Sequence, residues 1–252
     1  MSSTSLNPAL FRPLHSGSCL VQCSTCNLRE ICLPVGLSRE DLKHIDHRLV
    51  SSRRRVARGA SLFRAGEKFD SLYAVWTGCF KTVVRSDAGR DQVTGFQLPG
   101  ELVGVSGIDS GQHQIDAVAL EDSQVCVIPF AELEALSREV PALQMQFHRL
   151  MSREIAADHR IMLQLGSMHA EERVAAFLLN LTHRLQTRGF SASSLLLRMS
   201  REEIGSFLGL QLETVSRTLS RFQSNGLLVV RQRHIEVSDA AGLKRVLEGA
   251  TT

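Results

Sequence analysis

The chain of 252 residues lacks any apolar run that approaches the eighteen residues needed for a membrane-spanning helix, which excludes a membrane span. The first eighteen residues also lack the apolar core of a secretion signal, so we expect a cytoplasmic protein. No nucleophile–base set and no phosphate-binding loop is recognisable, and the nine histidines are scattered. These absences argue against an enzyme.

Charge is informative through its distribution and not through its total. The 29 Lys and Arg residues against 26 Asp and Glu leave a formal net charge of only +3. From Glu171 onward there are eleven basic and eight acidic residues, whereas the preceding 170 residues hold eighteen of each. A positive excess confined to the last third suits a module that faces a polyanion.

The first half of the chain predicts a β-rich domain. Residues 1–18 are rich in Ser and Pro without periodicity, which predicts a disordered lead, and residues 38–49 predict a short helix. Short apolar runs with glycine and polar punctuation then recur at even spacing, as in an antiparallel barrel or roll. The predicted strands are 61–63, 72–76, 79–85, 94–98, 114–120 and 124–129.

Residues 141 to about 165 predict one long helix, with Pro only at its start and Gly166 at its close. One apolar stripe contains Leu143, Phe147 and Leu150. A second stripe has the 4, 3, 4, 3 spacing of a coiled-coil seam and consists of Met151, Ile155, Asp158, Met162 and Leu165. Two stripes predict two partners, the helix's own β-roll and a twin helix in a homodimer. A single broad apolar face in a monomer is the alternative.

The last part of the chain has the pattern of a winged helix-turn-helix. Ser200 and Glu203 stand at the ends of a capping box, Gly209 supplies a turn, and a second helix begins near Gln211. A turn at 225–226 then precedes a hairpin with a basic tip at 231–234, a wing that could rest on phosphate. An ordinary solvated helix with a common charge pattern is the alternative.

The exposed side of that second helix supplies the candidate DNA contacts. Arg217 near the helix start can grip guanine O6 and N7, and Glu213 can accept from cytosine N4. The full candidate set for DNA binding is Glu213, Ser216, Arg217 and Arg221 on the helix with Arg231 and Arg233 on the wing.

Four of the six cysteines lie within fourteen residues: Cys19, Cys23, Cys26 and Cys32. In a reducing cytosol such a cluster indicates metal binding or redox activity. Cys126, on a predicted strand, supplies a distant fourth thiolate to Cys23, Cys26 and Cys32. Four thiolates suit either zinc or an iron–sulfur cluster; three ligands in one loop plus a distant one favour the cluster, and unliganded thiols are a third alternative. Cys79 is expected to be a core residue.

Cysteine loop, β-roll, long helix and C-terminal helix-turn-helix in this order resemble the CRP/FNR superfamily, specifically the FNR type of anaerobic regulator. The resemblance covers about residues 19–246. Five motifs carry it: CSTCNLREICLP at 23–34, TGFQLPGELVG at 94–104, CVIPF at 126–130, AEER at 170–173 and GLQLETVSR at 209–217.

This resemblance implies an α+β fold with an N-terminal antiparallel β-roll, which is a jelly roll like that of cyclic-nucleotide-binding domains. It implies a cysteine loop at 19–33, a β-roll sensor domain at 34–140, a dimerisation helix at 141–166 and a winged helix-turn-helix domain at 167–252. It further implies an oxygen-responsive global transcription regulator that forms a homodimer and activates or represses genes of anaerobic metabolism.

For individual residues, the resemblance implies that Cys23, Cys26, Cys32 and Cys126 hold a [4Fe-4S] cluster, with Cys19 a non-essential extra. Base readers would be Glu213, Ser216 and Arg217, on TTGAT-type half-sites in an inverted repeat of double-stranded DNA. RNA polymerase would contact the 86–91 loop and the region of Arg188. Gln211, in place of a better Thr cap, Leu212 and Asn27 are positions that vary among relatives, so base preference and cluster lifetime can differ here.

The chief rival function is a cyclic-nucleotide receptor on the same fold, since Gly100-Glu101-Leu102 matches the ribose-binding motif of such receptors. A cyclic phosphate also needs a cation, typically Arg one strand later. Residues 114–118 instead contain Asp116 and no Arg. We therefore expect no cyclic nucleotide and interpret residues 100–102 as a turn retained by the fold.

Asp158 is the predicted dimer switch, because on the seam of a symmetric dimer it faces its own copy. Two carboxylates a few ångströms apart repel by about 3–4 kcal/mol at an effective dielectric near 20. The alternative is that Asp158 points to solvent at the seam edge. The hypothesis is that the cluster folds the cysteine loop over the long helix, with Ile31 as an apolar contact, and thereby offsets this repulsion and favours the dimer.

Overall fold

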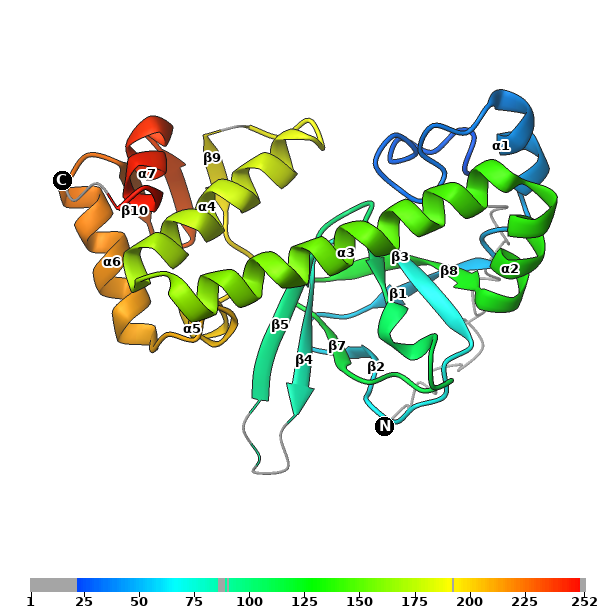
Figure 1. The fold of residues 1–252 in the computed structure, drawn as a ribbon, viewed down its shortest axis with the longest axis horizontal. Helices are drawn as coiled ribbons and strands as arrows, with labels where there is room; N and C mark the ends of the chain where they lie inside the picture. Colours follow the sequence, from blue (N-terminus) through cyan, green and yellow to red (C-terminus); the bar gives the residue numbers. More distant parts are fainter. Residues whose placement is uncertain (1–21, 86–88, 90, 192, 250–252) are drawn as a thin grey trace, which may run out of the picture.

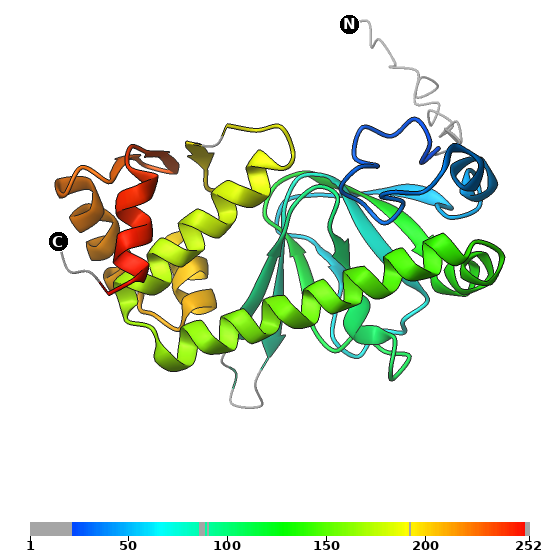
Figure 2. The same cartoon turned by 45° about the horizontal axis from the view of Figure 1, so that its top comes forward.

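The computed structural model describes residues 22–85, 89, 91–191 and 193–249 (Figure 1). The predicted lead at 1–18 and Cys19 lie outside these residues. An N-terminal β-roll and a C-terminal helical domain lie side by side, and the long helix α3 (Pro141–Ser167) runs past the roll toward the C-terminal domain. Figure 2 shows the same arrangement from a second direction, with the cysteine loop beside the roll. The predicted α+β class is confirmed.

Two four-stranded antiparallel sheets form the roll, as the recurring short runs predicted. One has the order β1-β8-β3-β6 and the other β2-β7-β4-β5. The first contains β1 (Ser52–Val56), β8 (Ser123–Pro129), β3 (Ser71–Thr77) and β6 (Leu102–Val103). The second contains β2 (Ser61–Phe63), β7 (Asp116–Ala119), β4 (Phe80–Arg85) and β5 (Asp91–Gln97).

The sequence did not predict β1 or β6. Four of the five β1 residues are exposed, so no period of two appears, and β6 has only two residues. The turn between β3 and β4 requires glycine at position 78, where φ is +92° and a Cβ would lie 2.1 Å from the Ser123 hydroxyl oxygen.

Three helices flank the cysteine end of the roll: α1 (Arg39–Ile45), α2 (Phe130–Glu139) and the start of α3. Ser38 caps α1, since its hydroxyl accepts from the Asp41 N–H at 3.0 Å. The predicted helix over 38–49 ends earlier, at Ile45. Helix α2 was not predicted. A short 3-10 helix, η1 (Val105–Gly107), follows β6.

One apolar stripe of α3 packs as predicted, because Leu143 is fully buried and Phe147 and Leu150 lie against the same cluster. Gly166 does not close the helix. Its φ is not positive, and the helix continues to Ser167, where the Met168 N–H donates to the Gln164 carbonyl. Among the described helices, none combines the length and apolarity that a bilayer crossing requires.

The C-terminal domain is the predicted winged helix-turn-helix. Its elements are α4 (Ala170–Gln186), β9 (Ser194–Leu196), α5 (Arg201–Leu208), α6 (Leu212–Ser224), β10 (Leu228–Arg231), β11 (His234–Val237) and α7 (Ala240–Leu247). Strand β9 and helix α7 are additions to the prediction. The capping box is present, with Ser200 accepting from the Glu203 N–H at 3.1 Å and Glu203 accepting from the Ser200 N–H at 2.6 Å.

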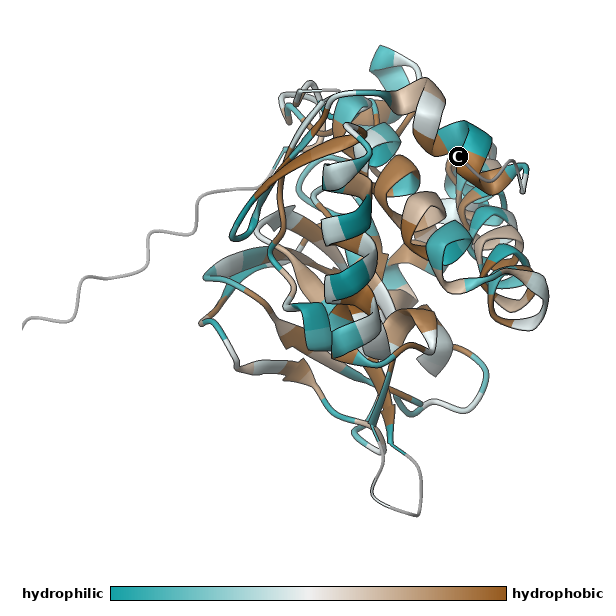
Figure 3. Ribbon diagram, turned by 90° about the vertical axis from the view of Figure 1, so that its left-hand side faces the viewer, coloured by the Kyte–Doolittle hydropathy of each residue, from teal (hydrophilic) through white to brown (hydrophobic). Residues whose placement is uncertain are grey.

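A hydrophobic core continues from the roll into the DNA-binding domain. Phe96 of β5 packs between Phe177 of α4 and Phe207 of α5, with ring centroids 6.1 and 5.3 Å away. Figure 3 shows that the helices of this domain alternate hydrophobic and hydrophilic residues, as amphipathic helices packed on a core should. The DNA-binding domain is thus docked on the roll by apolar contact.

Candidate functional site

Successive turns and two anchors fold the cysteine loop. The Cys26 N–H donates to the Cys23 carbonyl at 3.2 Å, and the Cys32 N–H donates to the Leu28 carbonyl at 2.9 Å. Ser24 ties the loop to the segment after α1, because its N–H donates to the Asp46 carboxylate at 3.0 Å and its hydroxyl donates to the other carboxylate oxygen. Cys23 and Leu33 also belong to a hydrophobic cluster with residues of the roll and its helices, so the loop is packed as well as hydrogen-bonded.

The four predicted thiols are neighbours. Cys126 lies on β8, and every pair among Cys23, Cys26, Cys32 and Cys126 is close enough for the charges to interact. Cys23 and Cys126 are buried, and all four are free thiols. Cys79, by contrast, is a buried core residue away from the loop, as expected.

Burial makes uncompensated thiolates costly at this place. Burial and the nearby cysteines raise the pKa of Cys23, and burial raises the pKa of Cys32 to about 12. The pKa of Cys126 is raised mainly by burial, against an opposing effect of Arg53. A metal group of high positive charge would offset this cost and hold four thiolates together.

The spacing of the four cysteine side chains helps to decide whether a zinc ion or an iron–sulfur cluster fits between them. Zinc needs four sulfurs about 2.3 Å from one point. Within the described ranges, no three Cys, His, Asp or Glu side chains form a group suited to a single metal ion. A four-iron cluster binds each cysteine through a different iron, so its ligands stand further apart. A clustered but open thiol set is compatible with such a cluster.

A cation also lies beside Cys126. Arg53 of β1 is the register partner of Cys126 on β8, so both side chains leave the sheet on one face. The Arg53 guanidinium carbon lies 3.7 Å from the centre of the Trp76 ring, a cation–π contact that holds it there. The sequence did not predict that Arg53 lies beside Cys126 and Trp76, because these three residues meet only through the pairing of their strands.

Besides the Ser24–Asp46 anchor, the loop contacts the turn between β5 and β6, and the segment after the loop contacts α3. Ile31 packs on Gly100, so closely that a Cβ at Gly100 would lie 2.9 Å from Ile31 Cγ1. Gly36 approaches the side chain of Gln146 on α3. Ile31 thus contacts the β5–β6 turn, and its expected contact with the long helix stays a prediction.

Gly100 and Glu101 form more than a retained turn. Gly100 has φ +88°, as a turn glycine, but the Glu101 carboxylate is bound by two arginines of the C-terminal domain. It accepts from Arg184 Nε at 3.0 Å and from Arg188 Nη2 at 2.6 Å. Sequence analysis missed this site, because 83 residues separate Glu101 from Arg184.

Asp116 occupies the strand where a cyclic-nucleotide receptor would need a cation. Its side chain is 4% exposed, pairs with Arg85 at 2.6 Å and accepts from the Ala65 N–H at 2.8 Å. Arg85 is therefore already engaged by a carboxylate. Asp116 and Glu101 thus both have protein partners, and the strand offers a carboxylate where a cyclic phosphate would need a cation.

The candidate base readers lie on the outer face of α6. Glu213 and Arg217 are exposed, whereas Ser216 is half-buried and its hydroxyl oxygen lies 3.3 Å from Arg201 Nη1. Arg221 is exposed but pairs with Glu171 at 2.5 Å. Gln211 makes no side-chain cap bond, consistent with its being a weaker cap than Thr.

The wing places its two arginines differently. Arg231 ends β10, and Arg233 follows the turn residue Gln232, whose φ is +57°. Both arginines are exposed, and Arg233 Nη1 donates to the Arg198 carbonyl at 3.2 Å. Both wing side chains therefore remain accessible to phosphate.

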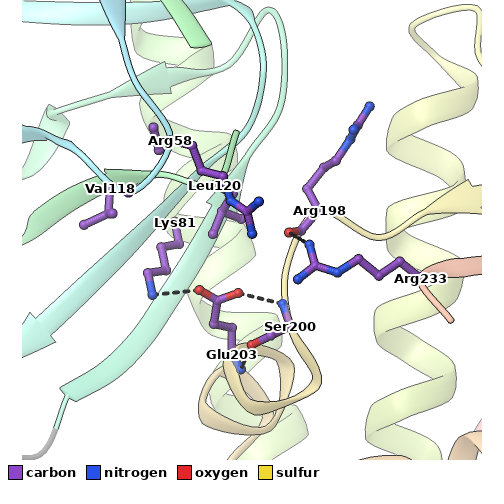
Figure 4. A pocket seen from close by; sticks show the side chains of 10 residues that line it. Arg58, Lys81, Val118, Leu120, Arg198, Ser200, Glu203 and Arg233 are labelled. Atoms are coloured by element: carbon purple, nitrogen blue, oxygen red, sulfur yellow. Dashed lines mark hydrogen bonds and ion pairs between the residues drawn. The ribbon is translucent and has the colours of Figure 1, made fainter. Parts of the chain in front are cut away.

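A cavity of about 210 Å³ separates the wing from the roll (Figure 4). Lys81 of β4 and Glu203 of α5 meet there at 2.8 Å, an ion pair between the two domains. The cationic side chains that line it are Arg58, Lys81, Arg198 and Arg233. Two of these four cations, Lys81 and Arg198, are paired with carboxylates, Glu203 and Glu121.

The seam stripe of α3 is exposed in the single chain. Ile155 and Met162 are 54% and 60% exposed, Asp158 is exposed, and Met151 is half-buried. This stripe is separate from the packed one, as the two-partner prediction required. Large apolar side chains left in water are a common feature of surfaces that bind a partner.

Comparisons with known proteins agree with the fold. Residues 172–246 match the Crp-like helix-turn-helix domain, and residues 53–139 match the cyclic nucleotide-binding domain. The solved structure of FixK2 from Bradyrhizobium japonicum has a TM-score of 0.71 at 31% identity, covering 77% of this chain and 96% of that chain.

Several curated proteins are similar over nearly the whole chain. "Transcriptional activator protein Anr" of Pseudomonas protegens is 46% identical over 228 residues, covering 90% of this chain and 93% of that protein. "Fumarate and nitrate reduction regulatory protein" of Salmonella typhimurium is 41% identical over 234 residues, covering 93% of each. "Transcriptional regulatory protein btr" of Bordetella pertussis is 47% identical over 225 residues, covering 89% and 93%.

Proposed function

Since this chain belongs to the CRP/FNR family of transcription regulators, and to its FNR type, we propose that it regulates anaerobic metabolism in response to oxygen. Members of this family regulate transcription and are not enzymes. A relative in Pasteurella multocida, 43% identical, is named "Anaerobic regulatory protein", which supports the anaerobic part of the proposal. Because its ligand is DNA, we propose a cytoplasmic location.

The proposed sensor is a [4Fe-4S] cluster held by Cys23, Cys26, Cys32 and Cys126. The single observation that carries this proposal is the meeting of three loop thiols with a thiol of β8, two of the four, Cys23 and Cys126, being buried. When bound, the cluster supplies the oxygen-sensitive chemistry. The chain supplies the thiolates, excludes water by burial and positions the Arg53 cation beside Cys126.

The proposed output is a dimer bound to an inverted repeat of TTGAT-type half-sites. The seam of α3, formed by Met151, Ile155, Asp158 and Met162, would pair with its copy and place two α6 helices one DNA turn apart. Glu213, Ser216 and Arg217 would read bases, while Arg221, Arg231 and Arg233 would bind the backbone. Loss of the cluster would release the loop and leave Asp158 repulsion to separate the subunits.

This proposal divides the chain into four working parts: the cysteine loop at 19–33, the sensor roll at 34–140, the dimerisation helix at 141–166 and the DNA-binding domain at 167–252. RNA polymerase contact is proposed at the 86–91 loop, of which residues 86–88 and 90 lie outside the described residues, and near Arg188. The Arg188 side chain itself is only 6% exposed, so its exposed neighbour Phe190 is the better candidate. Glu101, at the ribose-binding position, is engaged by Arg184 and Arg188, and residues 114–118 hold no Arg for a cyclic phosphate, which supports the proposal that no cyclic nucleotide is bound.

An absorption spectrum of protein purified without air tests the cofactor. An iron–sulfur cluster gives a brown protein with a broad charge-transfer band, whereas zinc gives a colourless one. Replacing Cys126 with Ser should abolish the band, while Cys79→Ser, which changes a buried cysteine just before β4 and outside the thiol group, should retain it. A colourless wild-type protein would contradict the proposal.

A further inference from the structure

Glu101 lies at the junction between the sensor roll and the DNA-binding domain. Its carboxylate accepts hydrogen bonds from three residues: from the Leu98 N–H at 2.9 Å, from Arg184 Nε at 3.0 Å and from Arg188 Nη2 at 2.6 Å. The first fixes the carboxylate within its own turn. The other two come from α4 and the residues that follow it, in the DNA-binding domain.

The two arginines are held rigidly on the roll. Arg184 Nη2 donates to the Phe96 carbonyl at 2.5 Å, and Arg188 Nε donates to the Pro99 carbonyl at 2.6 Å. The side chains of Glu101, Arg184 and Arg188 are 23%, 26% and 6% exposed. Removing one partner from such a sheltered charge group leaves the others without compensation and is far more disruptive than losing a surface ion pair.

The same turn carries the contact with the cysteine loop. Ile31, next to Cys32, packs on Gly100, next to Glu101. The loop, the turn and the two arginines therefore form an unbroken series of contacts from the thiols to α4. None of these contacts passes through the seam of α3.

The docked arrangement leaves the DNA-reading side free. Phe96, Phe177 and Phe207 hold α4 and α5 on the roll, while Glu213 and Arg217 of α6 stay exposed. Docking on the roll therefore fixes the DNA-binding domain in an orientation that DNA can reach.

We propose that Glu101 is a positioning residue that links the cysteine loop to the orientation of the DNA-binding domain through Arg184 and Arg188. An ordered loop keeps Ile31 on Gly100 and so keeps Glu101 in place for the two arginines. This gives the chain a second route of control, separate from dimer formation. The link to oxygen rests on the proposed function; the link between Glu101 and DNA binding does not.

The test is a double-mutant cycle on the full chain with Glu101→Gln, Arg184→Gln and the double variant. Each single variant should lower affinity for an inverted-repeat DNA duplex roughly tenfold. The loss in the double variant should be smaller than the sum of the two single losses, because all three variants lack the Glu101–Arg184 contact. Dimer content, measured by sedimentation, should not change. Amide hydrogen exchange over residues 184–190 should rise in each variant.

Glu121→Gln is the matched control, since Glu121 also joins the domains through an ion pair, to Arg198 at 2.9 Å, but does not adjoin the loop contact. It should leave exchange at 184–190 unchanged. Additive losses in the double variant, unchanged exchange, or unchanged or tighter DNA binding by Glu101→Gln would each overturn the proposal. Iron is measured on the same wild-type sample. Absence of iron would contradict the proposed cluster, whereas hydrogen exchange at residues 184–190 tests the role of Glu101 whether or not iron is found.

Discussion

Ile31 lies against the backbone of Gly100, so that the residue before a candidate cluster ligand contacts the residue before the arginine-binding Glu101. A side chain at position 100 would collide with Ile31, and φ of +88° disfavours any residue with a Cβ. The contact makes the cysteine loop part of the packed structure of the roll.

Gly100→Ala should therefore lower stability through two effects, backbone strain and the collision with Ile31. Gly111→Ala provides the matched control, because φ is +70° there but nothing lies within 4 Å of the added carbon. We expect Gly100→Ala to cost about 1–3 kcal/mol more than the control, the range for overpacking. Urea unfolding of both variants measures the difference, and equal losses would show that the Ile31 contact adds nothing.

Asp158→Ala should give a dimer that binds DNA in air. Removing the carboxylate from the seam removes a repulsion of about 3–4 kcal/mol in a symmetric pair, so dimerisation would no longer need the ordered loop. Sedimentation and DNA binding under air measure both effects. Arg160→Ala removes a charge from the same helix away from the seam and should leave an aerobic monomer; an aerobic monomer from Asp158→Ala would remove the switch.

Arg217→Ala should relax base choice, whereas Arg233→Ala should weaken binding to every sequence alike. Arg217 is exposed on the outer face of α6, where a guanine contact contributes about 1–3 kcal/mol of discrimination. Arg233 would contact phosphate, so its loss should also make the salt dependence of binding less steep. Titrations with a duplex altered at one guanine, at two salt concentrations, separate these roles.

The roll should lose stability at mildly acidic pH because of His113. This side chain is 2% exposed, stacks on Phe63 at 3.6 Å and leaves Nδ1 without a partner in the described structure. Burial lowers the pKa of His113, with an opposing effect of Glu67. The unfolded chain, with a histidine pKa near 6.5, thus takes up the proton first, and stability present above about pH 6.5 falls as pH decreases.

Urea unfolding at pH 7.5 and 5.5 measures this effect. His113→Phe keeps an aromatic ring for Phe63 and should reduce the fall in stability between the two pH values. His159→Phe, at an exposed position of α3, should keep the wild-type pH dependence. An identical pH dependence for wild type and His113→Phe would exclude His113 as the titrating group.

Sequence motifs predicted the structural features that depend only on residues close together in the chain. The capping box at Ser200 and the turn at Gly209, with φ +63°, need only neighbouring residues, and both are present. Helix α2 escaped prediction because it begins at Phe130 directly after β8, without a polar linker or a side-chain cap. The cysteine spacing singled out four thiols that the structure brings together.

The sequence alone did not predict the contacts between segments that are distant along the chain. Arg53 meets Trp76 and Cys126 only because β1 and β3 both pair with β8. Glu101 was interpreted as a turn residue, since nothing near it in the chain indicates that Arg184 would bind it. Such tertiary ion pairs have no periodicity or spacing that a single sequence could reveal.

The central claim is that closure of four thiols around iron controls DNA binding. Iron, labile sulfide and DNA affinity should therefore be measured on one sample prepared without air, before and after exposure to air. The account predicts about four iron and four sulfide per chain, tight binding to the inverted repeat, and loss of all three together in air. Protein free of iron and sulfide that binds the same DNA at full strength would contradict it.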